Sequence, residues 1–181
     1  PTAPEIFSSM DKPGAAFGVS VSGNYDYVAD YSFGLQIIDI SNPAEPVIVG
    51  TIDTPGIALG VTVSGNYAYV ADARSGLQVI DISNRAAPVI IGSIDTPGFA
   101  AGVTVSGHYA FVAPDTSGLQ VIDISNPAAP EIVGSIDTPG DAHRVILSCP
   151  HSSVAHYTFR LQIFDISKSR VPITIHNIYK P

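Results

Sequence analysis

The sequence repeats itself with a period of 42 residues and without a gap. The segment GVTVSGNYAYVADARSGLQVIDISN begins at Gly60 and returns in closely similar form at Gly18 and at Gly102. A fixed period of this length requires a fold in which one supersecondary unit is stacked in tandem. Counted from the first residue, the chain is a single repeat array of four units and a partial fifth: 1–42, 43–84, 85–126, 127–168 and 169–181.

Each unit has the pattern of four short strands. Val61 and Val63 alternate with small or polar residues, and the Ser-Gly-Asn-Tyr that ends at Tyr67 is typical of a tight hairpin turn. The nearly continuous apolar run at 77–83 indicates a strand that is covered on both faces, and 88–94 gives a fourth strand before an Asp-Thr-Pro-Gly turn. No segment has the pattern of an amphipathic helix. The sequence therefore predicts an all-β propeller of four-stranded blades, with about four blades and one extra strand.

The same residues resemble a known family. The string that runs from Asn66-Tyr67 through GLQVIDIS to an Asn-Pro-Ala-x-Pro turn is similar to the LVIVD repeat, a propeller-type repeat typical of bacterial and archaeal cell-surface or exported proteins. The resemblance covers residues 1–140 well, whereas the fourth unit keeps its beginning and LQIFDIS. It implies a propeller fold and an extracellular or cell-surface location. It implies no catalytic residues, because the family is defined by strand positions.

The two ends of the chain both carry a segment with the pattern of the fourth strand, around Pro4 to Met10 and around Ile173 to Ile178. Only one of them can cover the edge of the strand at 161–167. We expect the C-terminal segment to do so, because it closes a much shorter loop. Three alternatives then stay open: the ring closes within one chain, two chains share a ring as a homo-oligomer through their terminal strands, or the chain is a fragment of a longer array.

Charge and composition exclude several classes of function. The formal charge is −8 with 13% charged residues, so an acidic chain without a basic stripe is not expected to bind nucleic acid. No apolar run is long enough to insert into a membrane, and residues 1–20 do not have the pattern of a signal peptide. The single cysteine, Cys149, excludes an internal disulfide framework, and no cofactor motif is present.

Aspartates recur at three places in the repeat. Those in the apolar third strand are expected to be buried and hydrogen-bonded, because an unpaired buried carboxylate is costly: Asp39, Asp81, Asp123 and Asp165. Those in the loop before that strand and in the Asp-x-Pro-Gly turns are expected to emerge at one end of the blades and form an exposed acidic face: Asp30, Asp72 and Asp115, with Asp11, Asp53, Asp95 and Asp137. A cation could bind such a face, but Asp is also a common turn residue and no dense calcium-loop spacing occurs. No metal site is therefore predicted.

The fourth unit differs from the other three and is the candidate source of an asymmetric site. It concentrates histidine and basic residues where the other units have small ones, and a ring of near-identical blades offers no asymmetric pocket. A ligand site in this unit would be formed by His143, Arg144, His156, Tyr157, Arg160 and Asp141. The competing interpretation is that a terminal repeat is atypical because it faces a different neighbour.

These observations favour a non-enzymatic propeller module that is exported or surface-displayed and binds a protein, a glycan or a small ligand. Two alternatives remain. One is an enzyme with its site at the propeller mouth in the fourth unit, and the other is a propeller fragment that self-assembles. No cofactor, nucleic-acid partner or membrane insertion is expected in any of the three.

Overall fold

The architecture is that of a computed structural model, which describes residues 6, 8–115, 117–136, 142–148, 151–156, 160–165 and 173–179. The described residues form four antiparallel sheets, each of four strands that are consecutive in the sequence. The predicted all-β class and four-stranded blades are thereby confirmed. Among these residues there is no helix with the length and apolar character needed to span a bilayer. The strands are β1 (Gly18–Ser22), β2 (Tyr25–Ala29), β3 (Leu35–Asp39), β4 (Val47–Ile52), β5 (Gly60–Ser64), β6 (Tyr67–Ala71), β7 (Leu77–Asp81), β8 (Val89–Ile94), β9 (Ala100–Ser106), β10 (Tyr109–Pro114), β11 (Leu119–Asp123), β12 (Glu131–Ile136), β13 (Ala142–Ser148), β14 (His151–His156), β15 (Arg160–Asp165) and β16 (Ile173–Tyr179).

The turn between the first two strands of a blade follows from its sequence. Ser22 pairs with Tyr25, so the loop has two residues, and its first residue, Gly23, has a φ of 60°. A two-residue hairpin with positive φ at its first central position is a type II′ turn, which matches the twist of the strands and favours glycine there. The third strand is buried on both faces in each of the first three blades, as the apolar run predicts.

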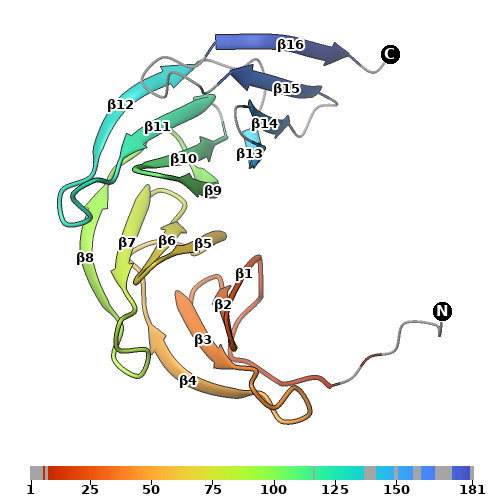
Figure 1. The fold of residues 1–181 in the computed structure, drawn as a ribbon, viewed down its shortest axis with the longest axis vertical. Helices are drawn as coiled ribbons and strands as arrows, with labels where there is room; N and C mark the ends of the chain where they lie inside the picture. The colour runs from red at the N-terminus through yellow and green to blue at the C-terminus, as the bar shows by residue number, and fades with distance from the viewer. Residues whose placement is uncertain are drawn as a thin grey trace.

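The four sheets stand side by side in an open arc (Figure 1). Strands β1, β5, β9 and β13 line its concave side, and β4, β8, β12 and β16 lie on the outside. Neighbouring inner strands pack together, β1 with β5, β5 with β9 and β9 with β13. In the part of the chain that the structure describes, the first and fourth sheets stand apart across the opening of the arc. A ring closed within one chain is therefore not the arrangement observed.

The C-terminal strand completes the fourth sheet. Strand β16 pairs antiparallel with β15, with Leu161 opposite Ile178. The prediction that this strand covers the edge of its own blade is confirmed. The competing N-terminal segment, residues 4–10, lies partly outside the described residues, and its described part contains no strand.

The hydrophobic core lies between blades rather than within them. The face of a blade that looks toward the next blade is called here its far face, and the face toward the preceding blade its near face. One cluster joins the far face of the first blade to the near face of the second, and the same arrangement recurs at the next two junctions. The first cluster contains Tyr27, Ala29, Leu35 and Ile37 from the far face and Val61, Ala68, Val70, Ile80 and Ile82 from the near face.

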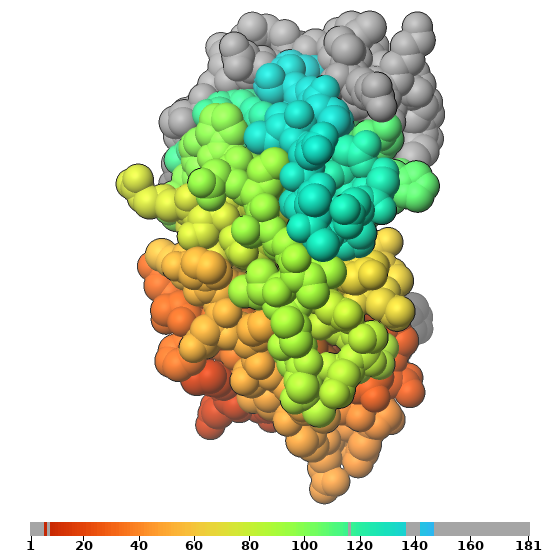
Figure 2. All heavy atoms as spheres, turned by 90° about the vertical axis from the view of Figure 1, so that its left-hand side faces the viewer, coloured from red at the N-terminus to blue at the C-terminus, as the bar shows by residue number. Residues whose placement is uncertain are grey.

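A loop of the second blade fastens this junction on the convex side, where the second sheet lies against the first (Figure 2). Arg85 donates from Nε to the Tyr27 hydroxyl at 3.0 Å, and its guanidinium lies 4.4 Å above the centre of the Tyr25 ring. The backbone approaches closely here, since a Cβ on Gly50 would lie 1.9 Å from the carbonyl oxygen of Arg85. A glycine is required at position 50 so that the loop can sit on strand β4.

Two aspartates of the loop before the third strand are buried, so the prediction that they form an exposed acidic face is wrong. Asp30 and Asp72 are fully buried. Asp72 accepts hydrogen bonds from Thr54 Oγ1 at 2.6 Å and from the backbone N–H of Gly56 at 2.8 Å. The preceding Asp-Thr-Pro-Gly turn folds over this loop and supplies the donors, which is why a carboxylate can be buried there.

The third-strand aspartates, which were expected to be buried, lie at the strand end instead. Asp39, Asp81 and Asp123 are each the last residue of their strand, and each accepts a hydrogen bond from the backbone N–H two residues later. They are therefore local turn acceptors near solvent. Hydrogen bonds from the side chain and backbone of Ser41 lower the pKa of Asp39, and those from the backbone and side chain of Ser83 lower the pKa of Asp81. Asp165 likewise ends β15.

Burial raises the pKa of Asp72 above its usual value, although the bonds from Thr54 and Gly56 oppose this effect. A raised pKa in the folded state means that the stability contributed by Asp72 is greatest below about pH 4 and declines as the pH rises through the folded-state value. We expect the difference in free energy of unfolding between wild type and Asp72→Asn to become smaller as the pH rises from 3 to 7, because wild type loses stability over this range. Denaturant unfolding of both proteins across this range measures it, and a difference that grows with pH would contradict the assignment.

Candidate functional site

The inner strands of the arc enclose a narrow channel of about 230 Å³. Each of the first three blades lines it with the same three consecutive repeat positions, and the fourth blade lines it with β13. The lining residues are Phe17-Gly18-Val19, Leu59-Gly60-Val61, Ala101-Gly102-Val103 and Arg144-Val145-Ile146. The channel is therefore built by the inner strands of all four blades, with the lining of the fourth shifted by one residue along the repeat.

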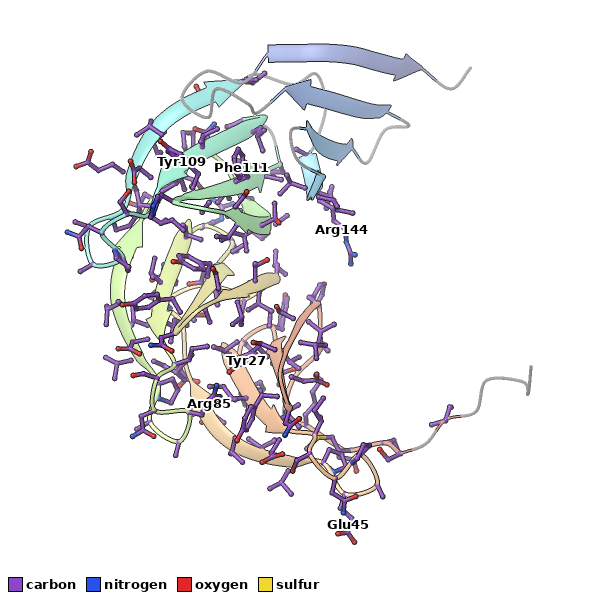
Figure 3. The ribbon with its side chains drawn as sticks, viewed as in Figure 1. Tyr27, Glu45, Arg85, Tyr109, Phe111 and Arg144 are labelled. Atoms are coloured by element: carbon purple, nitrogen blue, oxygen red, sulfur yellow. The ribbon has the colours of Figure 1, made fainter. Side chains whose placement is uncertain are left out.

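Glycine at the centre of this motif lets neighbouring inner strands approach each other. A Cβ on Gly18 would lie 2.8 Å from the carbonyl oxygen of Leu59, and one on Gly102 would lie 2.8 Å from that of His143. The fourth blade carries Arg144 at this repeat position. Its side chain is exposed and points into the open centre of the arc (Figure 3).

A larger cavity of about 540 Å³ opens at one end of the channel, and we call it the rim pocket. Its wall contains the residue that precedes the glycine position in every blade: Phe17, Leu59, Ala101 and His143. These four positions are equivalent in the repeat but carry four different side chains. Tyr31, Phe99, Asp115 and Arg144 complete the lining. The rim pocket is therefore asymmetric although the blades around it are alike.

A β-bulge brings two consecutive residues of β13 to the rim pocket. Ala142 pairs with His156 and Arg144 with Ala155, so His143 is the extra residue of the bulge. Successive side chains of a regular strand point to opposite faces, whereas a bulge re-aims one of them. This explains how both His143 and Arg144 line the same cavity.

The aromatic side of the rim pocket is held by a stacked pair. The rings of Phe17 and Tyr31 lie 5.3 Å apart between centroids at an interplanar angle of 23°. Tyr31 has a φ of 55°, in the left-handed region, where the second repeat has Ala73 at 51°. A bulky residue in this conformation costs about 1 to 2 kcal/mol. Reciprocal backbone hydrogen bonds between Tyr31 and Ala58, 3.1 and 3.0 Å long, help to hold it there.

The third repeat places its carboxylate one residue later than the others. Pro114 occupies the repeat position of Asp72, and a register shift follows Ala113. Asp115 consequently accepts a hydrogen bond from the backbone N–H of Phe99 at 3.0 Å. This bond fixes the loop that carries Phe99 to the edge of the rim pocket.

The structure brings two of the six predicted site residues together at the pocket, His143 and Arg144. The backbones of His156 and Arg160 lie at the same end of the fourth sheet, since His156 pairs with Ala142 and Arg160 begins β15. The other two predicted residues, Tyr157 and Asp141, lie outside the described residues, as does Cys149.

Sequence reasoning missed the aromatic half of the site, Phe17, Tyr31 and Phe99. The missed signal lay in the columns of the repeat. The position before the glycine changes from Phe to Leu to Ala to His while its neighbours stay nearly constant. Within the described residues no group of three or more His, Cys, Asp or Glu is arranged to hold a metal ion. The pocket therefore combines apolar walls with a guanidinium, an imidazole and a carboxylate, which is the make-up of a small-molecule binding site.

Comparison with known families supports the repeat assignment. The LVIVD repeat family matches the chain three times, over residues 13–54, 55–96 and 97–138. The suspected resemblance is therefore confirmed. A search of curated protein sequences finds no significant match.

Solved structures of similar fold include natural and designed proteins. The computationally designed Ika4 protein superposes with a TM-score of 0.70 at 9% identity, covering 91% of this chain and 99% of that one. The β-propeller domain of Cps50 (Swd1) from Myceliophteria thermophila gives 0.72 at 12% identity over 91% of this chain and 59% of that one. Hydrazine synthase from Kuenenia stuttgartiensis gives 0.71 at 19% identity over 93% and 49%. The chain thus spans 59% and 49% of the latter two proteins, and these likenesses show the fold.

Proposed function

Since this chain belongs to the LVIVD repeat family, we propose that it is a non-enzymatic propeller module that binds a small ligand in the rim pocket. The observation that carries this proposal is the asymmetry of the pocket wall, where four equivalent positions hold Phe17, Leu59, Ala101 and His143. The proposal includes the exported or cell-surface location that the family resemblance implies.

The lining indicates the chemistry of the ligand. A volume of about 540 Å³ lies in the ordinary range for small-molecule sites. Phe17, Tyr31 and Phe99 offer faces on which a flat apolar group can stack. Arg144 and His143 lie beside them and can bind an anionic group, because a guanidinium pairs with a carboxylate through two parallel hydrogen bonds. A planar organic anion, such as an aromatic carboxylate, fits both features.

Isothermal titration calorimetry with benzoate and 2-naphthoate tests this proposal, with benzamide and 2-naphthamide as neutral counterparts. We expect the carboxylates to bind more tightly than the amides, and Arg144→Gln to weaken carboxylate binding about tenfold, in line with the loss of a charge-assisted pair. The control is Arg85→Gln, which removes the same charge from an arginine at the junction of the first two blades, outside the rim pocket. Equal binding of acids and amides, or equal loss in both variants, would contradict the proposal.

A further inference from the structure

The first blade has a near face that lacks the cover its equivalents have. Val19 is 62% exposed, whereas the residues at the same repeat position in the next three blades, Val61, Val103 and Val145, are 7%, 8% and 6% exposed. In the second and third blades this valine packs into the core between two blades. The first blade thus has the same near face as the other blades, but no preceding blade packs against it.

The exposed residues form a continuous apolar stripe along β1, which we call the open face: Phe17, Val19 and Val21. They alternate along the chain and so lie on one side of it. Their equivalents in the second blade, Leu59, Val61 and Val63, are all at least partly buried. An exposed stripe of this kind marks a contact surface rather than an ordinary solvated strand.

We propose that the open face is covered by the fourth sheet of a second copy of this chain, so that two chains share one ring. At the three junctions inside the chain, the structure that covers this position is always the far face of another four-stranded blade. The fourth sheet, β13–β16, is the blade at the other end of the arc (Figure 1). The proposal does not rest on the rim-pocket function.

Charge selects which end of the second copy docks. The first matched repeat, residues 13–54, contains five carboxylates and no Lys or Arg, and Asp30 among them pairs with Lys12, so residues 12–54 carry a formal charge of −4. The last segment, residues 139–181, contains five Lys or Arg against two Asp, a formal charge of +3. Contact between the first blade of one copy and the last blade of the other therefore joins opposite charges. Contact between two first blades would join like charges and is disfavoured.

The open arc agrees with sharing of a ring, because the first and fourth sheets stand apart and each has a place for a further blade (Figure 1). Two copies related by a twofold axis along the channel would form the same first-to-fourth contact twice and leave no free blade. This differs from oligomerisation through terminal strands, because the contact is made by sheet faces and β16 stays in its own blade.

The junction between copies differs from those within the chain in two ways. Asp26 stands in the near face of the first blade where the second and third blades have Ala68 and Ala110, and its Oδ1 is buried without a partner among the described residues. Arg144 replaces the glycine, so the inner strands must lie slightly further apart there than at Gly18 or Gly102. We therefore expect a reversible dimer rather than an obligate one, because polar groups and looser packing characterise such interfaces.

Sedimentation velocity over a range of protein concentrations tests the proposal. We expect a species of twice the 18.9 kDa chain mass that dissociates on dilution and is weakened by high salt. Val19→Asp should raise the dissociation constant about tenfold or more, since it places a carboxylate in an apolar contact. Val89→Asp is the matched control, because Val89 is 55% exposed on the outer strand β8. Val21→Lys on the open face should act like Val19→Asp.

Three outcomes would overturn the proposal. A mass of one chain at every concentration would show that no copy docks. A dimer that survives both open-face variants, whose folding is checked by circular dichroism, would place the contact elsewhere. A mass that keeps rising with concentration would indicate an open filament instead of a closed ring.

Discussion

Gly76→Ala is expected to lower the free energy of unfolding by about 3 kcal/mol or more, which is large for a single methyl group. Gly76 has a φ of 66°, a conformation that costs an alanine energy by itself. In addition, its Cβ would lie 2.2 Å from the carbonyl oxygen of Ile94 and 2.7 Å from the backbone nitrogen of Thr96. These atoms belong to the end of the fourth strand and its turn, so relief of the clash would separate them from β7.

Gly65→Ala supplies a control in which only the conformational cost remains. Gly65 has a similar φ of 58°, but no atom lies within 4 Å of its would-be Cβ. We expect this variant to lose about 1 kcal/mol. Urea unfolding of the two variants beside wild type measures the difference. Equal losses would show that the loop relaxes around the methyl group added at Gly76 and that the close approach is not a constraint.

Asp72→Ala is expected to lower the free energy of unfolding by about 2 to 3 kcal/mol. The substitution removes the acceptor of the Thr54 hydroxyl and the Gly56 N–H, which then lose their partner in a part-buried loop. Asp81→Ala is expected to be nearly neutral, because the N–H of Ser83 that Asp81 accepts from is exposed and can bind water.

Thermal or urea unfolding of the two variants shows whether the loop aspartate or the strand-end aspartate contributes more to stability. A larger loss for Asp81→Ala would restore the expectation drawn from the sequence. Asp39 and Asp30 provide a second pair, since Asp39 accepts from Ser41 at a strand end, whereas Asp30 is buried and accepts from the Gly14 N–H and from Lys12. Agreement between the pairs would show that the repeat position sets the effect.

Much of the fold could be predicted because the repeat makes each local signal appear several times. The hairpin at Gly23 recurs at Gly65 and Gly107 with nearly the same φ, and the apolar third strand recurs in every unit. Loop length also placed the C-terminal strand correctly on β15. These features depend on residues that are close in the sequence, so they can be read from one sequence alone.

The aspartates were assigned the wrong way round because their environment depends on contacts distant in the sequence. Asp81 is the last residue of the apolar strand β7 and therefore lies at its end, near solvent. Asp72 lies in a polar loop, but the turn that contains Thr54 folds over this loop and buries it. Ring closure could not be predicted for the same reason, since the strand count is the same in an open arc and a closed ring.

The candidate site could be predicted only in part. His143 and Arg144 were identified because they break the repeat with charged or polar residues. Phe17 and Tyr31 were missed because an aromatic residue in an apolar repeat has the pattern of core, and their exposure at the pocket depends on how the blades are placed.

The side chains of Phe17, Leu59, Ala101 and His143 can change independently of one another. Each comes from a different blade and lines the rim pocket. A substitution at Leu59 or Ala101 therefore changes the chemistry of the pocket at one blade and leaves the side chains that the other three blades contribute unchanged. The ligand preference of the pocket can then be adjusted one blade at a time, while the four-stranded blades themselves stay the same.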